Sequence, residues 1–172
     1  VINKGVTEEN LLQAVEAAFK QGWKQVKLYF MMGLPTETDE DIIGIANLAK
    51  KVVDKYFEVK GRRGCTVTIS VSCFVPKPFT PFQWASQRTK EEFLDKAYLT
   101  RTSIATQLNQ KSIKYNWHEA DVSVLEGIMA RGDRRLNQVI LKAYQKGCIY
   151  DAWSEYYKND VWMQTFEECG IN

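Results

Sequence analysis

Along the first 110 residues, segments with apolar residues at helical spacing alternate with short, continuous apolar runs. Apolar residues recur at three- and four-residue spacing over 7–22 and 38–57, which predicts two helices. Each of these segments begins at a threonine followed by acidic residues, a combination typical of a helix N-terminus. The apolar runs at 26–32 and 66–75 are short and rich in β-branched or aromatic residues, so they predict strands. Helices alternating with strands predict parallel crossovers and an α/β fold.

The second half of the chain is predicted to be mainly helical. Prolines and aromatic residues crowd a rigid loop at 76–84, and a helix is expected over 90–110. The segment 112–117 is a candidate strand. Helical spacing then returns in three stretches: 121–131, 133–147 and 158–169. We therefore divide the chain into 1–110, which carries the two predicted strands, and 111–172, a mostly helical extension.

Composition and charge narrow the function classes only a little. The chain has 172 residues and a net charge of +2, a balance too even to indicate a protein that binds nucleic acid. No apolar stretch approaches the ~20 residues that a membrane span needs. The four cysteines are scattered and the single histidine stands alone, so no metal site is expected. Sparse, unpaired cysteines favour a reducing, cytoplasmic location.

One segment carries most of the chemical information. Residues 29–38, Tyr-Phe-Met-Met-Gly-Leu-Pro-Thr-Glu-Thr, are expected to form a strand end, a tight turn and a helix start. Ligands of parallel α/β folds bind at the carboxyl ends of strands, where this turn would lie. Gly33 permits close approach to the backbone, Pro35 stiffens the turn, and Glu37 can accept hydrogen bonds. A strand-to-helix connection without a ligand explains the same residues equally well.

This segment resembles the fifth-strand signature of the radical S-adenosylmethionine (radical SAM) enzymes. The proline-rich turn 76–84 is similar to the exit of their sixth strand. The segments 117–120 and 125–136, Trp-His-Glu-Ala and Leu-Glu-Gly-Ile-Met-Ala-Arg-Gly-Asp-Arg-Arg-Leu, resemble one subgroup. Its members usually carry an N-terminal cobalamin-binding domain. The likeness covers nearly the whole chain.

The resemblance implies a partial (β/α)6 TIM-like barrel and an iron–sulfur enzyme of the oxidoreductase type. In the family, a 4Fe–4S cluster held by three cysteines binds S-adenosylmethionine and reductively cleaves it, starting radical chemistry on a substrate. Cobalamin is a candidate second cofactor. The family's Cys-x-x-x-Cys-x-x-Cys loop has no counterpart here, and the chain begins Val-Ile-Asn-Lys without an initiator Met. We therefore expect a C-terminal part that lacks metal ligands and is inactive alone, its main partner being the N-terminal part of the same protein.

The resemblance also implies which residues hold the cofactor. Glu37 would add a polar contact. Backbone and apolar contacts would come from the residues of the fifth-strand exit: Met31, Gly33, Leu34 and Pro35. The sixth-strand exit would contact the adenine through Phe74, Val75 and Pro76. Ordinary core positions are an equally good interpretation of Met31 and Phe74.

Candidate substrate residues lie further along the chain. Arg131 and Arg134, which cluster with Arg135, would suit a phosphate or carboxylate. A helix-end ion-pair set of these arginines with Asp133 and Glu126 is the favoured interpretation. His118 is a candidate acid, base or substrate contact, with simple hydrogen bonding as its alternative. Aromatic residues crowd the second half and favour an interface over a planar substrate. The alternative function is a non-catalytic α/β scaffold or protein-interaction module.

Overall fold

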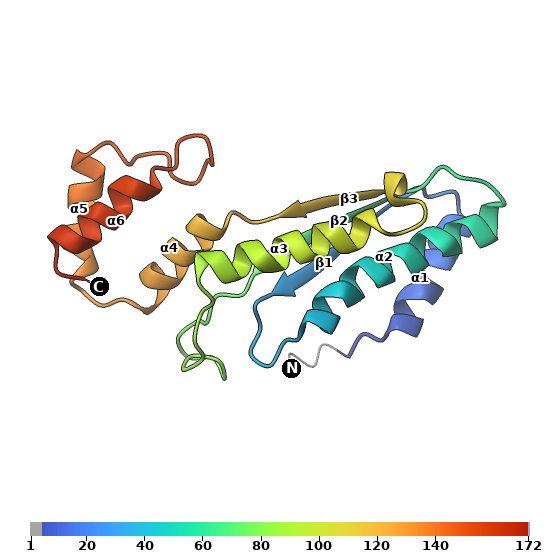
Figure 1. The fold of residues 1–172 in the computed structure, drawn as a ribbon, viewed down its shortest axis with the longest axis horizontal. Coiled ribbons are helices and arrows are strands. Elements are labelled where there is room, and N and C mark those ends of the chain that lie inside the picture. Colours follow the sequence, from blue (N-terminus) through green and yellow to red (C-terminus); the bar gives the residue numbers. More distant parts are fainter. Residues whose placement is uncertain (1–4, 172) are drawn as a thin grey trace. The chain divides into compact units, whose positions relative to one another are not determined.

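The computed structural model describes residues 5–171, which form two compact units (Figure 1). The first unit runs to Phe74 and takes in Glu91–His118. The second contains Val75–Lys90 and the part of the chain from Glu119 onward. The segment 113–117 thus belongs to the first unit, and the proline-rich loop belongs to the second.

The first unit is built on a parallel sheet. Its elements are α1 (Glu8–Lys20), β1 (Gln25–Met32), α2 (Asp39–Lys60), β2 (Thr66–Cys73), α3 (Lys90–Ala105), the 3-10 turn η1 (Gln110–Ser112) and β3 (Ile113–Trp117). The three strands lie in the order β1-β2-β3, and both neighbouring pairs are parallel. The predicted strands at 26–32 and 66–75 are therefore parallel neighbours, joined by a crossover that contains the predicted helix. The candidate strand at 112–117 is confirmed as β3.

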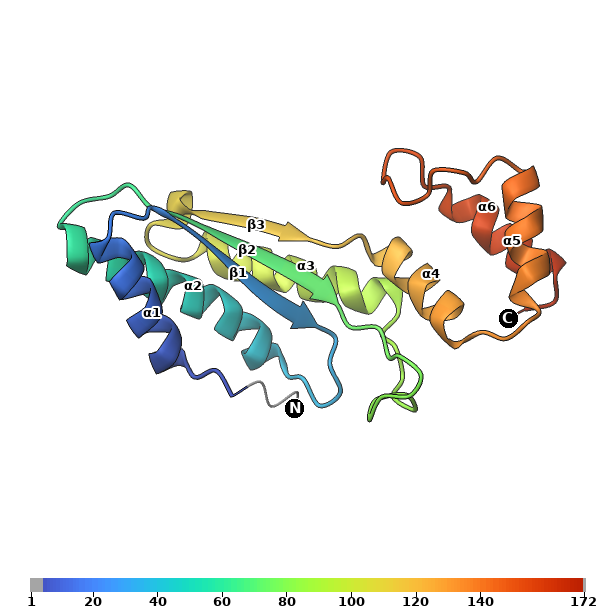
Figure 2. The same cartoon turned by 180° about the vertical axis from the view of Figure 1, so that it is seen from behind.

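The core of this unit lies between the sheet and its helices. Helices α2 and α3 lie in front of the sheet in Figure 1 and behind it in Figure 2. Alternate residues of the middle strand face them and are fully buried: Val67, Ile69 and Val71. From α2, Ala46, Ala49 and Val52 are buried, and α1 packs on α2 through the edge-to-face pair Phe19–Tyr56, with ring centroids 5.0 Å apart. Sheet and helices thus share a single apolar layer.

Element ends differ slightly from the predicted ones, for local reasons. Helix α2 continues to Lys60 because Gly61, at φ 64°, takes the left-handed conformation and donates its N–H to Phe57 O at 2.7 Å. Strand β2 stops at Cys73, shortly before Pro76, which has no N–H for a ladder. Helix α3 ends at Ala105, ahead of the left-handed Asn109 that opens η1.

The fold class is α/β, as expected, but the described residues form an open sheet and no closed barrel. In parallel folds a barrel closes only when enough strands pair edge to edge around it. In the described part of the chain, β1 and β3 each pair on one side alone.

The second unit is a small helical cluster. Its helices α4 (Ala120–Arg131), α5 (Leu136–Gln145) and α6 (Asn159–Glu168) match the three predicted helices. Buried Val139, Trp162 and Phe166 hold α5 against α6. The proline-rich loop is tied to α4 by the Lys77–Glu126 ion pair and by Gln87, whose Nε2 donates to Ser123 O at 2.7 Å. Among the described residues, no helix is long and apolar enough to cross a membrane.

The start of α2 yields a prediction about stability and pH. Thr38 and Asp41 form a capping box, in which the Asp41 carboxylate accepts the Thr38 N–H at 2.9 Å and Thr38 Oγ1 accepts the Asp41 N–H. Thr38→Ala should lower the free energy of unfolding by about 1 kcal/mol at pH 7. The hydrogen bond from the Thr38 backbone holds the pKa of Asp41 below its ordinary value. The ionised Asp41 carboxylate therefore stabilises the folded protein above its unfolded pKa of about 4. This stabilisation is lost as the pH falls through the pKa of Asp41 in the folded protein.

Urea denaturation of wild type and Asp41→Asn at pH 7 and pH 3 checks this effect. The variant should be less stable than wild type at pH 7, and the difference should be smaller at pH 3. Glu40→Gln, at an exposed neighbouring position, is the matched control and should differ little from wild type at either pH. An Asp41→Asn deficit of equal size at both pH values would contradict the capping argument.

Candidate functional site

The carboxyl ends of all three strands lie at one edge of the sheet, because the strands are parallel. Gly33, Phe74 and His118 are the first residues beyond β1, β2 and β3. The Phe74 N–H donates to Met32 O at 2.8 Å, and the His118 N–H donates to Val71 O at 3.0 Å. Gly33 and Phe74 therefore lie side by side, and His118 lies at the same edge of the sheet, next to the last residues of β2.

The turn after β1 has a strained backbone. Gly33 is buried and has a φ of 85°, a conformation that favours glycine. Thr36 has a φ of 66°, which is rare for a β-branched residue. The Glu37 N–H donates to Leu34 O at 3.2 Å and closes the turn. Gly33 is thus required by the backbone itself, whatever approaches it.

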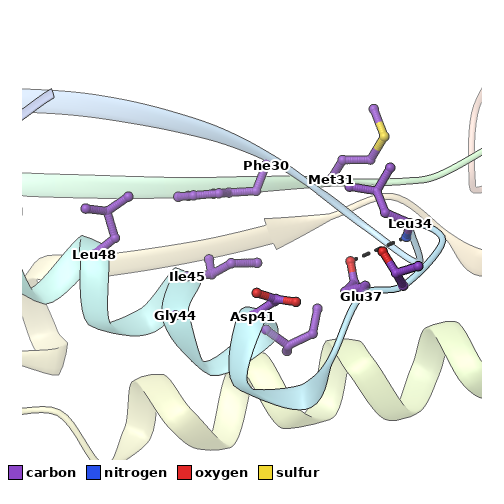
Figure 3. Close-up of a pocket in the computed structure, with 10 residues that line it drawn as sticks. Phe30, Met31, Leu34, Glu37, Asp41, Gly44, Ile45 and Leu48 are labelled. Carbon is purple, nitrogen blue, oxygen red and sulfur yellow. Dashed lines mark hydrogen bonds between the residues drawn. The ribbon is translucent and has the colours of Figure 1, made fainter. Parts of the chain in front are cut away.

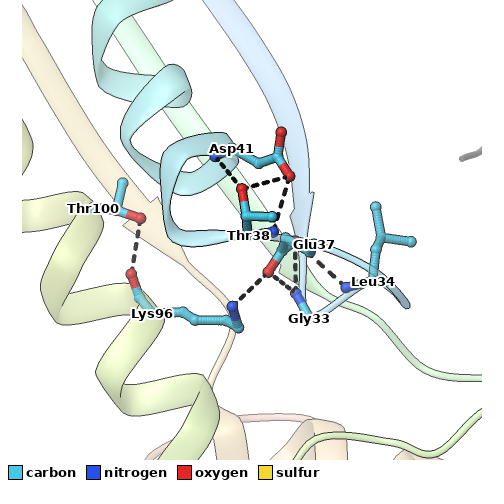
Figure 4. A network of polar contacts seen from close by, with 7 residues as sticks. All are labelled: Gly33, Leu34, Glu37, Thr38, Asp41, Lys96 and Thr100. Atoms are coloured by element: carbon cyan, nitrogen blue, oxygen red, sulfur yellow. Dashed lines mark hydrogen bonds and ion pairs between the residues drawn. The ribbon is translucent and has the colours of Figure 1, made fainter.

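The Glu37 carboxylate holds this turn from within (Figure 4). Its oxygens accept the Gly33 N–H at 2.9 and 3.0 Å, and Oε2 is 3.4 Å from the Leu34 nitrogen. Lys96 reaches over from α3 and places its Nζ 2.9 Å from Oε1. The side chains of Glu37 and Lys96 are only 5% and 12% exposed. Glu37 is therefore engaged inside the protein, and its immediate effect is to fix the turn.

A cavity of about 430 Å³ lies between β1 and the first turns of α2 (Figure 3). Its size falls in the range of small-molecule sites. Predicted residues Met31, Leu34 and Glu37 line it, together with mainly apolar neighbours: Phe30, Thr36, Asp41, Ile42, Gly44, Ile45 and Leu48. Gly33 and Pro35 do not line this cavity.

The remaining predicted cofactor residues are divided between the units. Phe74 is buried at the end of the first unit, next to Met32. Val75 and Pro76 follow it directly but belong to the second unit, where Val75 is half-buried and Pro76 is buried. Their predicted contact with adenine stays a prediction.

Arg131, Arg134 and Arg135 are exposed, and Arg131 and Arg135 have separate partners. Arg131 donates from Nη1 to Ala85 O at 3.1 Å, holding the proline-rich loop. Arg135 pairs with Asp133 at 2.9 Å, and this hydrogen bond holds the pKa of the Asp133 carboxyl below its ordinary value. Glu126 pairs with Lys77 instead of an arginine, and Arg134 is exposed. The favoured ion-pair interpretation therefore holds for Arg135 and Asp133 alone.

His118 is exposed at the sheet edge. Its carbonyl oxygen is 3.7 Å from Cys73 Sγ, the donor. All four cysteines are free thiols, and burial raises the pKa of Cys65. The residues that the structure describes include no group of three or more His, Cys, Asp or Glu side chains that would hold a metal ion.

Lys96 is the site residue that sequence reasoning missed. It lies within α3, far along the chain from Glu37, and nothing in its local pattern distinguishes it from a surface lysine. The signal available was indirect: an acid within a tight, apolar turn needs a charged partner when it is buried.

Comparison with known proteins gives one similar sequence. The chain is 30% identical over 174 aligned positions to Uncharacterized protein MJ0966 of Methanocaldococcus jannaschii, covering 99% of this chain and 35% of that protein. The chain thus spans about a third of the length of this relative. No family model matches the chain, and no solved structure matches it.

The buried ion pair yields a second prediction. Lys96→Met should leave the Glu37 carboxylate buried without its cation and lower the free energy of unfolding by about 3 kcal/mol. The double variant Lys96→Met/Glu37→Gln should recover part of this loss, since no charge then remains buried. Urea denaturation at pH 7 measures both effects.

The matched control is Lys51→Met, which breaks the exposed pair between Lys51 and Glu8, each 49% exposed. Its effect should stay below about 1 kcal/mol. If Lys96→Met were no more harmful than Lys51→Met, the Glu37–Lys96 pair would not hold the turn.

Proposed function

We propose that this chain is the C-terminal part of a radical SAM iron–sulfur enzyme. The activity implied by the sequence resemblance is reductive cleavage of S-adenosylmethionine, which supplies a radical for chemistry on a substrate. The observation that carries the proposal is that Gly33, Phe74 and His118 each follow a strand at the carboxyl edge of one parallel sheet. Ligands of parallel α/β folds bind at this edge.

Residues of the β1 turn have distinct roles in this proposal. Met31 and Leu34, which line the cavity, would offer apolar contact to the adenosyl group, and Pro35 would stiffen the turn beside them. Gly33 is buried with its N–H held by Glu37, and it would supply the backbone conformation that the turn needs. Glu37 and Lys96 fix the turn in place through their buried ion pair. A turn that is rigid before the ligand arrives loses little entropy on binding.

The sheet supports a partial barrel as the architecture of the full protein. β1 and β2 would be the fifth and sixth barrel strands, and β3 would extend the sheet beyond them. The edge of β1 that does not pair with β2 would receive strands from the N-terminal part. The cluster-binding cysteines would also come from that part, because Cys65, Cys73, Cys148 and Cys169 do not have the Cys-x-x-x-Cys-x-x-Cys spacing. The larger share of the Methanocaldococcus relative lies outside the aligned region, which leaves ample chain for both.

The test uses the full-length gene product, purified without oxygen. It should contain a Cys-x-x-x-Cys-x-x-Cys loop, bind about four irons per chain and release 5′-deoxyadenosine from S-adenosylmethionine under reducing conditions. The 172-residue chain alone should neither bind the irons nor release 5′-deoxyadenosine. Full-length protein without the loop or without 5′-deoxyadenosine formation would refute the proposal, as would four irons bound by the short chain.

Met31→Ala in the full-length protein tests the site itself. Loss of an apolar contact should raise the KM for S-adenosylmethionine about tenfold, the equivalent of 1.4 kcal/mol. Met129→Ala, at a half-buried position on α4, is the matched control and should leave this KM unchanged. Equal KM values for both variants would remove Met31 from the site.

A protein-interaction role is the second candidate, favoured by exposed aromatic residues in the second unit. Trp153 is 61% exposed, and Tyr150 and Tyr156 form a ring pair with centroids 5.9 Å apart. Such residues are common anchors at interfaces. The free thiols are consistent with a cytoplasmic site of action for either function.

A further inference from the structure

The sheet face opposite α2 and α3 is mainly polar, with Met31 as its apolar residue at the carboxyl end of β1. Figure 2 views the sheet from this side, with α2 and α3 behind it. Side chains alternate between the two faces of a strand, so every second residue of each strand lies on this face. The residues are half-buried or exposed: Gln25, Lys27, Tyr29 and Met31 on β1, Thr66, Thr68, Ser70 and Ser72 on β2, and Lys114 and Asn116 on β3. We call this set the open face.

The strand register arranges the open face in rows. Lys27 pairs with Thr68, and Thr68 pairs with Lys114, so the two lysines flank a threonine. At roughly 4.8 Å between strands, their Cα atoms lie about 10 Å apart. The next row toward the carboxyl edge is Tyr29, Ser70 and Asn116.

A polar face is unusual on a parallel sheet. Such sheets are normally covered on both faces and have hydrophobic residues on both. The interior of a packed barrel is likewise filled by bulky branched side chains. Small hydroxyl side chains on β2 neither fill such space nor suit an apolar cover. Whatever lies against the open face is therefore polar, as a ligand or a solvated lumen would be.

The charge of the open face favours a negatively charged ligand. It carries Lys27 and Lys114 and no acidic side chain, whereas the acidic first turn of α2 belongs to the opposite layer. Neither lysine forms an ion pair with any residue that the structure describes. Lys27 lies over the Tyr29 ring, with its Nζ 5.2 Å from the centroid, which keeps the cation on this face.

We propose that the open face binds a small molecule bearing carboxylate or phosphate groups. Lys27 and Lys114 would contact its anionic groups, and Thr68, Ser70 and Asn116 would hydrogen-bond its remaining polar atoms. That this molecule is the enzyme's substrate rests on the proposed function; anion binding by the face does not.

The experiment titrates the isotope-labelled 172-residue chain with inorganic pyrophosphate and, separately, with citrate, following amide chemical shifts by NMR. Saturable shifts should concentrate on 25–31, 66–72 and 114–116. Lys27→Gln and Lys114→Gln should each weaken binding about fivefold, the equivalent of roughly 1 kcal/mol. A response to one probe alone identifies phosphate or carboxylate as the recognised group, and either response supports the proposal.

Lys24→Gln is the matched control, because it removes the same charge from an exposed position just before β1. It should bind both probes as wild type does. Equal weakening by Lys24→Gln, shifts spread over surface lysines generally, or no saturable shift with either probe would overturn the proposal. Since these titrations need neither cluster nor S-adenosylmethionine, their failure would leave the 5′-deoxyadenosine test of the proposed function intact.

Discussion

The buried contact between Glu37 and Lys96 is the interaction on which the candidate site depends. It joins the turn after β1 to α3, a helix that follows a different strand. The same carboxylate accepts the backbone N–H of Gly33, at a residue with positive φ. A buried carboxylate is tolerated only when its charge and lone pairs are satisfied. The turn and the helix therefore require each other, and the carboxyl edge of the sheet is ordered as one piece.

The two faces of the sheet serve different purposes. Towards the helices, Val67, Ile69 and Val71 are completely buried and supply the hydrophobic stabilisation of the first unit. On the other side, the same strand presents hydroxyl groups between lysines of its neighbours. One side of the sheet holds the fold together, and this leaves the residues of the other side available to bind. The strand exits, where Gly33 and His118 lie, connect the open face with the proposed cofactor site.

The relative from Methanocaldococcus jannaschii is about three times as long as the region that aligns with this chain. It matches nearly all of this chain with about a third of its own length. A three-stranded parallel sheet with free edges is a natural component of a larger α/β protein, because such sheets are normally extended and covered. The proposed radical SAM activity would belong to that larger protein, with this chain supplying one wall of the site.

Local patterns in the sequence determined the elements and their direction. The threonine caps at positions 7 and 38, the glycine at 61 and the β-branched run at 66–73 act through neighbouring residues, so their effects were predictable. The parallel pairing of β1 and β2 followed from the helix between them. Only the tertiary structure decided that Lys96 neutralises Glu37, that the Glu37 carboxylate is enclosed, and that Lys27 and Lys114 share a row. Each of these depends on which residues meet across separate elements, and that is set by packing and strand register rather than by spacing along the chain.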